Sequence, residues 1–167
     1  MTAYYQLLRR DLTKSLPAPQ WPADTRLDHY RLELAPAIHA VLRMTQAQGG
    51  GHVPNLKTWQ QQFITDAEFD PTLCLVASNA DGILGVAQCW TSAFIKHLCI
   101  HPCAQGQGLG RALLLHSFQV FKQREDRALA VVERDVIEIV EDAWLFQLAQ
   151  LGIHPAAAEH GDDVWMS

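Results

Sequence analysis

The residues with the clearest chemical potential lie in a glycine-rich turn that contains Gly106, Gly108 and Gly110. An apolar run ends at Pro102 just before the turn, and an apolar pattern of helical period begins directly after it. A strand, a glycine turn and a helix start together aim backbone N–H groups and the positive end of a helix dipole at an anion. The pattern therefore predicts a phosphate-binding turn.

Two common phosphate-binding loops do not fit the glycine spacing. A Walker loop needs a lysine and a hydroxyl residue directly after its last glycine, whereas Gly110 is followed by Arg111 and Ala112. The dinucleotide fingerprint needs glycines at relative positions one, three and six, and the sixth position here is Arg111 or Leu113. The remaining interpretation is a turn that closes around a pyrophosphate. The amides of residues 106–111 would donate to it, and Arg111 would add positive charge.

This stretch resembles the GCN5-related N-acetyltransferases, or GNAT family, in residues 98–102 (LCIHP) and 105–114 (QGQGLGRALL). The resemblance implies that acetyl-coenzyme A (acetyl-CoA) serves as co-substrate in a cleft between the fourth and fifth strands. Its pantetheine arm would pair with the backbone of the fourth strand, and the acetyl group would pass directly from the thioester to an amine. The cofactor-binding residues implied in this way are Leu98, Cys99, Ile100, Gln105, Gly106, Gln107, Gly108, Leu109, Gly110 and Arg111.

The proton-transfer residues of the GNAT family are missing from the corresponding positions. The glutamate that histone-type members use as general base falls at Phe94, and the tyrosine often used as general acid falls at Leu148 or Gln147. A replacement base must lie beside the cleft and accept a proton near neutral pH. The catalytic candidates are His97 and Glu133, with Asp135 as a further acidic residue at the same end of the fifth strand.

A possible metal pattern is excluded by strand geometry. His97, Cys99, His101 and Cys103 alternate at period two and so share one face of a strand. Residues two apart on a strand lie roughly 6–7 Å apart, so four of them cannot converge on one tetrahedral zinc ion. We therefore expect no metal.

The apolar periodicity predicts an α/β domain. A helix follows Pro36, a second helix follows the capping residue Asn55, and the third follows the glycine turn to about Arg124. Residues 4–14 are compatible with a short helix, and residues 136–151 with a last one. The expected strands are residues 72–78 and 83–91 as a hairpin, 94–101, 128–132 parallel to it, and a terminal one near Val164. The fold class is a mixed, mostly antiparallel central sheet flanked by helices. The resemblance implies that this sheet is splayed between its strands 4 and 5, as in acyl-CoA N-acyltransferases.

The composition is that of one globular domain. The chain has 167 residues, of which 49% are hydrophobic and 19% charged. We expect a single domain over residues 1–167 with residues 1–27 as an N-terminal arm. The net charge of −5 argues against a nucleic-acid partner, and no apolar run is long enough to span a membrane. The four cysteines form no CxxC pair, and the N-terminus does not resemble a signal peptide, so we expect a cytoplasmic protein.

Three functions remain open at this level. The first is an acetyl-CoA-dependent N-acetyltransferase that acts on a primary amine, with acetyl-CoA and an amine acceptor as partners. The second is a catalytically inactive CoA-binding module that serves as a sensor or interaction protein, because the usual base and acid are absent. The third is a plain phosphate- or nucleotide-binding domain. Members of the GNAT family are often dimers, so a homodimer is possible, but nothing in this sequence marks its interface.

Overall fold

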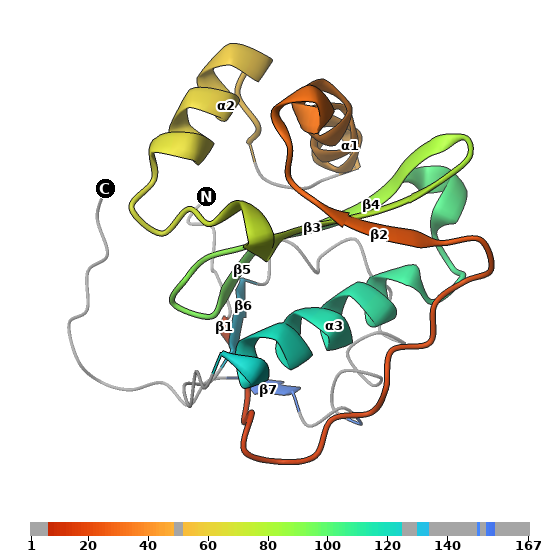
Figure 1. The fold of residues 1–167 in the computed structure, drawn as a ribbon, viewed down its shortest axis with the longest axis vertical. Coiled ribbons are helices and arrows are strands. Elements are labelled where there is room, and N and C mark those ends of the chain that lie inside the picture. The colour runs from red at the N-terminus through yellow and green to blue at the C-terminus, as the bar shows by residue number, and fades with distance from the viewer. Residues whose placement is uncertain (1–6, 49–51, 125–129, 134–149, 151–152, 156–167) are drawn as a thin grey trace.

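The structure, a computed structural model, describes residues 7–48, 52–124, 130–133, 150 and 153–155 (Figure 1). Three single turns of 3-10 helix, Leu32–Leu34, Pro71–Leu73 and Pro102–Ala104, connect the longer elements. The helices are α1 (Ala35–Ala47), α2 (Leu56–Thr65) and α3 (Leu109–Gln123). The strands are β1 (Leu7–Arg10), β2 (Arg26–His29), β3 (Cys74–Asn79), β4 (Gly82–Cys89), β5 (Phe94–Ile100), β6 (Ala130–Glu133) and β7 (Ile153–Pro155).

The strands form one sheet in the order β2-β3-β4-β5-β6-β1-β7. All neighbouring strands run antiparallel except β5 and β6, which are parallel. Helices α1 and α2 cover one face of the sheet and α3 covers the other, as Figure 1 shows. The predicted fold class is confirmed: a mixed, mostly antiparallel sheet flanked by helices.

The face under α1 and α2 is packed with apolar side chains from both helices. Ile38 and Leu42 of α1 and Trp59 and Phe63 of α2 are all buried against the sheet. Helix α2 begins as predicted, because the Asn55 side chain accepts a hydrogen bond from the Thr58 amide at 3.0 Å. Both helices therefore belong to one layer over this face of the sheet.

Helix α3 packs on the opposite face with an almost continuous apolar side. Leu113, Leu114, Phe118 and Phe121 are each no more than 1% exposed. The helix comes close to the sheet because β4 carries Gly85 beneath it. A Cβ atom at Gly85 would lie 2.9 Å from the Ile100 side chain and 3.0 Å from that of Leu113. The glycine thus sets how closely α3 lies against β5.

One sequence expectation is wrong and others fall outside the described residues. Residues 7–10 form strand β1 rather than part of a helix over residues 4–14, because both β6 and β7 pair with this segment. Backbone pairing on two sides outweighs the weak helical pattern of its leucines. The strand expected over residues 128–132 is confirmed as β6, parallel to β5. The helix over residues 136–151 and the terminal strand near Val164 lie outside the described residues, apart from Gln150, which is helical.

Candidate active site

Strand β5 separates from β6 shortly after it begins. The two strands pair only at Phe94 with Val131 and at Ile95 with Val132. The register between β4 and β5 shifts at this point, which leaves Lys96 as an extra residue without a partner in β4. From Lys96 to Ile100, β5 therefore has no neighbouring strand on its β6 side within the described part of the chain. The bulge marks the place where the sheet opens.

The hydrogen-bond alternation of an antiparallel ladder tells which groups face the opening. The His101 amide donates to the Leu84 carbonyl at 2.8 Å, so the groups of Cys99 and His97 also point toward β4. Those of Leu98 and Ile100 point to the open side. The Ile100 carbonyl already accepts a hydrogen bond from Gln105 Nε2 at 3.1 Å. The Leu98 amide and carbonyl and the Ile100 amide remain on the open edge.

The glycine turn joins β5 to α3 in a left-handed conformation. Gly106 and Gly108 have φ angles of +74° and +83°, which side chains other than glycine rarely adopt. The first hydrogen bond of α3 runs from the Ala112 amide to the Gly108 carbonyl at 3.0 Å. Among the described residues, the amides of residues 106–111 have no hydrogen-bond acceptor, and no side chain caps the helix. They form a row of free donors at a positive helix end.

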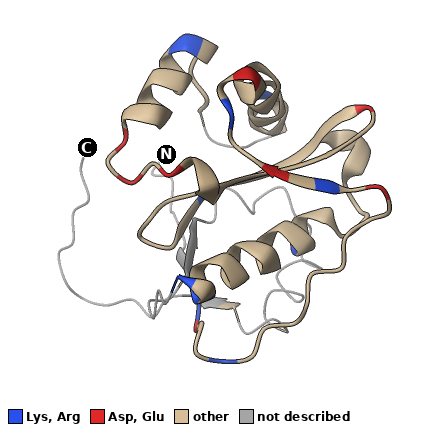
Figure 2. Ribbon diagram, in the orientation of Figure 1, with Lys and Arg blue, Asp and Glu red and all other residues tan. Residues whose placement is uncertain are grey.

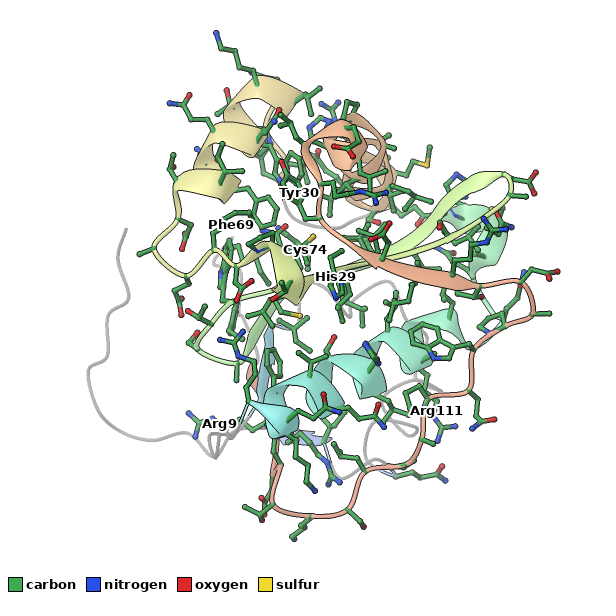
Figure 3. All side chains as sticks on the ribbon, viewed as in Figure 1. Arg9, His29, Tyr30, Phe69, Cys74 and Arg111 are labelled. Carbon is green, nitrogen blue, oxygen red and sulfur yellow. The ribbon has the colours of Figure 1, made fainter. Side chains whose placement is uncertain are left out.

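The side chains of the turn divide between solvent and core. Arg111 is exposed at the N-terminal end of α3 (Figure 3). The Leu109 side chain is 1% exposed and packs in the core, so this residue offers only its amide. Gln105 Nε2 donates to the Ile100 carbonyl and to Gln48 Oε1 at the end of α1, each at 3.1 Å. These two hydrogen bonds connect the turn to β5 and to α1. Gln107 Nε2 donates to the Cys103 carbonyl at 3.2 Å.

A pocket of about 530 Å³ lies on the face of the sheet that α1 and α2 cover, between α2, residues 52–54 and strands β4 and β5. Its apolar part is aromatic, because Trp59 and Phe63 stack with ring centres 5.4 Å apart, and Trp90 lies 5.7 Å from Phe63. Its polar part includes Gln88, Lys96 and His97 from β4 and β5. The full lining is His52, Val53, Pro54, Trp59, Gln62, Phe63, Thr65, Asp66, Gln88, Trp90, Lys96 and His97.

His97 lies in this pocket as a neutral imidazole. Burial, helped by the neighbouring Lys96 ammonium, lowers its pKa to about 4. At neutral pH the ring is therefore uncharged and one ring nitrogen can accept a proton or a hydrogen bond. Gln88 lies directly opposite His97 on β4, so the two side chains are cross-strand neighbours on one face.

Sequence reasoning did not single out Gln88. Its side chain is 4% exposed, and its Oε1 is buried without a hydrogen-bond partner in the described part of the chain. The signal in the sequence is one amide residue inside the apolar run of residues 83–90. A polar residue at a buried strand position must either find a partner or serve a ligand.

The remaining candidates are distributed as follows. Glu133 is the last residue of β6, and its register places it opposite Leu7 of β1. Phe94, which occupies the position of the family's glutamate, packs as a partly buried ring against the core under α1 and α2. Asp135, Gln147 and Leu148 lie outside the described residues.

The four alternating His and Cys residues do not come together. Burial raises the pKa of the Cys99 thiol to about 11, against a hydrogen bond with Thr45 that lowers it. His101 Nδ1 accepts a hydrogen bond from the amide of Cys103, whose side chain is exposed. Within the described ranges, no group of three or more His, Cys, Asp or Glu residues could hold a metal ion.

Acidic residues gather along the segment between α2 and β3 (Figure 2), which contains Asp66, Glu68 and Asp70. Each has a structural hydrogen bond. Asp66 accepts from the Glu68 amide at 2.8 Å, Glu68 accepts from the Ser92 amide at 3.1 Å, and Asp70 accepts from Arg124 at 3.2 Å. Of the three, only Asp66 lines the pocket.

The opened strand, the glycine turn and the start of α3 all lie within a stretch that matches a known sequence family. Residues 70–145 match the model of an acetyltransferase (GNAT) domain. This part of the chain is similar to the GNAT family. The resemblance seen in residues 98–114 is thereby confirmed, and the match extends over the hairpin before them. Among curated proteins, no sequence match is found.

Solved GNAT structures share the fold at low sequence identity. A GCN5-related N-acetyltransferase from Sphaerobacter thermophilus matches with a TM-score of 0.70 and 20% identity, over 91% of this chain and 48% of that one. One from Kribbella flavida gives 0.58 and 14%, over 90% and 53%. A tandem GNAT protein from the clavulanic acid biosynthesis pathway gives 0.56 and 19%, over 90% and 49%. At these identities the likeness shows the fold alone.

The chain spans about half the length of the solved structures that it matches. In the part of the chain that the structure describes, no helix is both long and apolar enough to cross a membrane. The fold of the chain is that of the GNAT structures it matches.

Proposed function

We propose that this protein transfers an acetyl group from acetyl-CoA to a primary amine by direct attack of the amine on the thioester. One observation carries the proposal. The open edge of β5 leads directly into a turn whose amides, at residues 106–111, have no acceptor among the described residues. An extended arm that ends in a pyrophosphate fits an open strand edge followed by a row of free donors.

In this proposal the backbone of β5 binds the extended arm of the co-substrate. Leu98 offers both its amide and its carbonyl, whereas Ile100 offers only its amide, because Gln105 occupies its carbonyl. The backbone groups of Cys99 point toward β4 and cannot pair with the extended arm. Of residues 98–100, only Leu98 and Ile100 are therefore proposed to bind it. The amides of residues 106–111 and the exposed Arg111 would hold the pyrophosphate.

Acetyl-CoA supplies an activated acyl group when bound. The chain must then deliver an amine in its neutral form, because a protonated amine has no lone pair for attack. His97 is uncharged at neutral pH and can accept the proton, although its low pKa makes it a weak base that passes the proton on to solvent. The Ile100 amide on the open edge is available to donate to a carbonyl oxygen. Glu133 remains the second candidate base.

The alternative is a CoA-binding module without transfer activity. The observation that favours it is Phe94, an apolar ring packed against the core at the position of the family's general base. A module of this kind would bind acetyl-CoA through the same turn and strand edge but would lack a residue that moves protons.

One experiment separates the two. Purified protein is incubated with acetyl-CoA and a panel of primary amines while free thiol is followed, and acetyl-CoA affinity is measured by calorimetry. Transfer predicts thiol release that depends on the amine and saturates with it. Tight binding with no release above background on any amine would favour the module, and failure to bind CoA would contradict both.

A further inference from the structure

The pocket beside His97 contains one buried amide side chain, that of Gln88, whose oxygen has no hydrogen-bond partner in the described part of the chain. Gln88 is 4% exposed and forms no hydrogen bond within the described residues, and its Oε1 is shielded from solvent. An unmatched buried amide costs about 1–3 kcal/mol. Because Gln88 lines the pocket while its oxygen is enclosed, the amide nitrogen is the end that reaches the pocket.

The charge of the pocket points in the same direction. Lys96, the bulged residue of β5, is the one Lys or Arg among the lining residues, which all lie within the described chain. Its ammonium and the Gln88 amide N–H are both donors, and a donor pair of this kind is complementary to a carbonyl or carboxylate oxygen. The one acidic lining residue, Asp66, is exposed and already accepts a hydrogen bond from the Glu68 amide.

The spacing of Gln88 and His97 limits the size of a ligand that contacts both side chains. The two residues are directly opposite on neighbouring strands, where Cα atoms lie about 5.5 Å apart in a hydrogen-bonded pair. Because both side chains leave the same face of the sheet at this spacing, a ligand that gives an N–H to the neutral His97 and an oxygen to Gln88 would hold the two groups close together, as an α-amino carbonyl compound does. Trp59, Phe63 and Trp90 offer an aromatic wall to the rest of the ligand.

We propose that the acceptor is an α-amino carbonyl compound with an apolar side chain, whose carbonyl or carboxylate oxygen is bound by Gln88 and Lys96. This inference rests on the proposed function and names the substrate class of the same site. The amine nitrogen forms a bond to the acyl carbon, the carbon–sulfur bond breaks, and the thiolate leaves as free thiol. The acceptor arrives as an ammonium ion and first loses one proton to His97 and on to solvent. The nitrogen loses a second proton as the amide forms, and this proton protonates the thiolate.

The test compares two primary amines that differ only in the carbonyl group, L-phenylalaninamide and 2-phenylethylamine. Their basicities differ, so the quantity of interest is the ratio of their kcat/KM values in the wild type and its change in a variant. We expect the ratio to fall by about 10-fold or more in Gln88→Leu, through a loss on L-phenylalaninamide alone. The matched control is Gln61→Leu, the same change on the exposed side of α2 outside the pocket, which should leave the ratio within about 2-fold.

L-phenylalanine and L-phenylalaninamide distinguish whether the bound oxygen belongs to a free carboxylate or to a peptide-type carbonyl. Lys96→Met should weaken L-phenylalanine more than L-phenylalaninamide if the ligand is a free carboxylate, and both by a similar factor if it is a peptide-type carbonyl. Gln88→Leu should fold at least as stably as the wild type, because it removes an unmatched polar group. If it does not fold, Gln88→Met makes the same comparison with an unbranched side chain.

Binding measured without turnover separates this inference from the proposed function. If no amine is acetylated, calorimetric titration with the same two amines still tests Gln88, and a ratio that depends on Gln88 supports the pocket assignment alone. If acetylation occurs but Gln88→Leu leaves the ratio unchanged, the acceptor class is overturned and the transfer function stands. An equal loss on both amines would also overturn it, since Gln88 would then contact the amine common to both.

Discussion

Gly108 shows how a single residue type determines the backbone geometry of a turn. Its φ of +83° places it in the left-handed region, and a Cβ there would meet nothing within 4 Å. A side chain at this position is therefore disfavoured by backbone conformation rather than by lack of space. The sequence predicted this turn from its glycines and from their place between an apolar run and a helical pattern, because few residues other than glycine adopt such a conformation.

Gly108→Ala should therefore weaken CoA binding while the fold survives. We expect a loss of about 1 kcal/mol in stability, because alanine strains the left-handed backbone, and about tenfold weaker CoA binding as the amides turn away from the pyrophosphate. Calorimetry and thermal unfolding measure the two effects. Gly82→Ala is the control, since Gly82 has a φ of +137° and equally open space in the β3–β4 turn. If both variants bind CoA like the wild type, the turn is not the phosphate site.

His97 links the pocket to the pH dependence of stability. Its pKa is lowered from 6.5 to about 4 in the folded protein, so the unfolded chain binds the proton more tightly. Stability should be highest above about pH 6.5 and should fall by about 1–3 kcal/mol as the pH drops toward 4. His97→Asn should remove much of this slope in urea unfolding measured between pH 7 and 4.5. His116, whose pKa burial also lowers, adds to the same trend. Identical slopes with and without His97 would contradict the assignment.

At the scale of elements, Gln105 connects the glycine turn to strand β5 and to the end of helix α1. Its side chain donates to the Ile100 carbonyl on β5 and to Gln48 at the end of α1. The sequence marked Gln105 as a cofactor residue by resemblance, but these two bonds join segments far apart in the chain and could not be read from spacing. The geometry favours a positioning role for its side chain.

Gln105→Leu should loosen the turn without changing the charge of the site. We expect about 1 kcal/mol lower stability and about 3- to 10-fold weaker CoA binding, because two hydrogen bonds that fix the turn are lost. Calorimetric titration with CoA gives the affinity. The matched control is Gln46→Leu, because Gln46 is a half-buried glutamine of α1 whose side chain contacts His52 and not the turn. CoA affinity unchanged by Gln105→Leu would show that the turn holds its shape without this side chain.

The elements differed in how well the sequence predicted them. Helix α2 and the β3–β4 hairpin were predicted because each carries its own signal, the cap at Asn55 and the turn at residues 79–82. Strand β1 was missed because its only signal is the presence of β6 and β7, which the local pattern does not contain. Gln88 was missed for a similar reason, since its importance depends on its lack of a partner in the folded chain.

At the scale of the whole molecule, the two apolar layers separate the cysteines by accessibility. Cys74, Cys89 and Cys99 are buried in these layers, whereas Cys103 is exposed beside the turn, and none of the four forms a disulfide. Burial raises the pKa of all three enclosed thiols, to about 12 for Cys89 and about 11 for Cys99. The sequence indicated only that the four cysteines form no CxxC pair, and the folded chain distinguishes Cys103 from the other three.

The native protein should therefore show one reactive thiol toward an aromatic disulfide reagent at pH 8, and four after denaturation. The three buried thiols can react only when the core opens, so the rate of their slow reaction measures that opening. Cys103→Ser should abolish the fast phase and leave the slow phase unchanged. A second fast thiol in the native protein would mean that one of the two layers is open to solvent.

The opened edge of β5 has a consequence for self-association. A bare strand edge is a template on which other chains can add, and proteins protect such edges with bulges and with lysine side chains. Both devices are present at Lys96, at the point where β5 leaves β6. The bulge that opens the sheet therefore also interrupts the straight, regular edge that an aggregating strand would need.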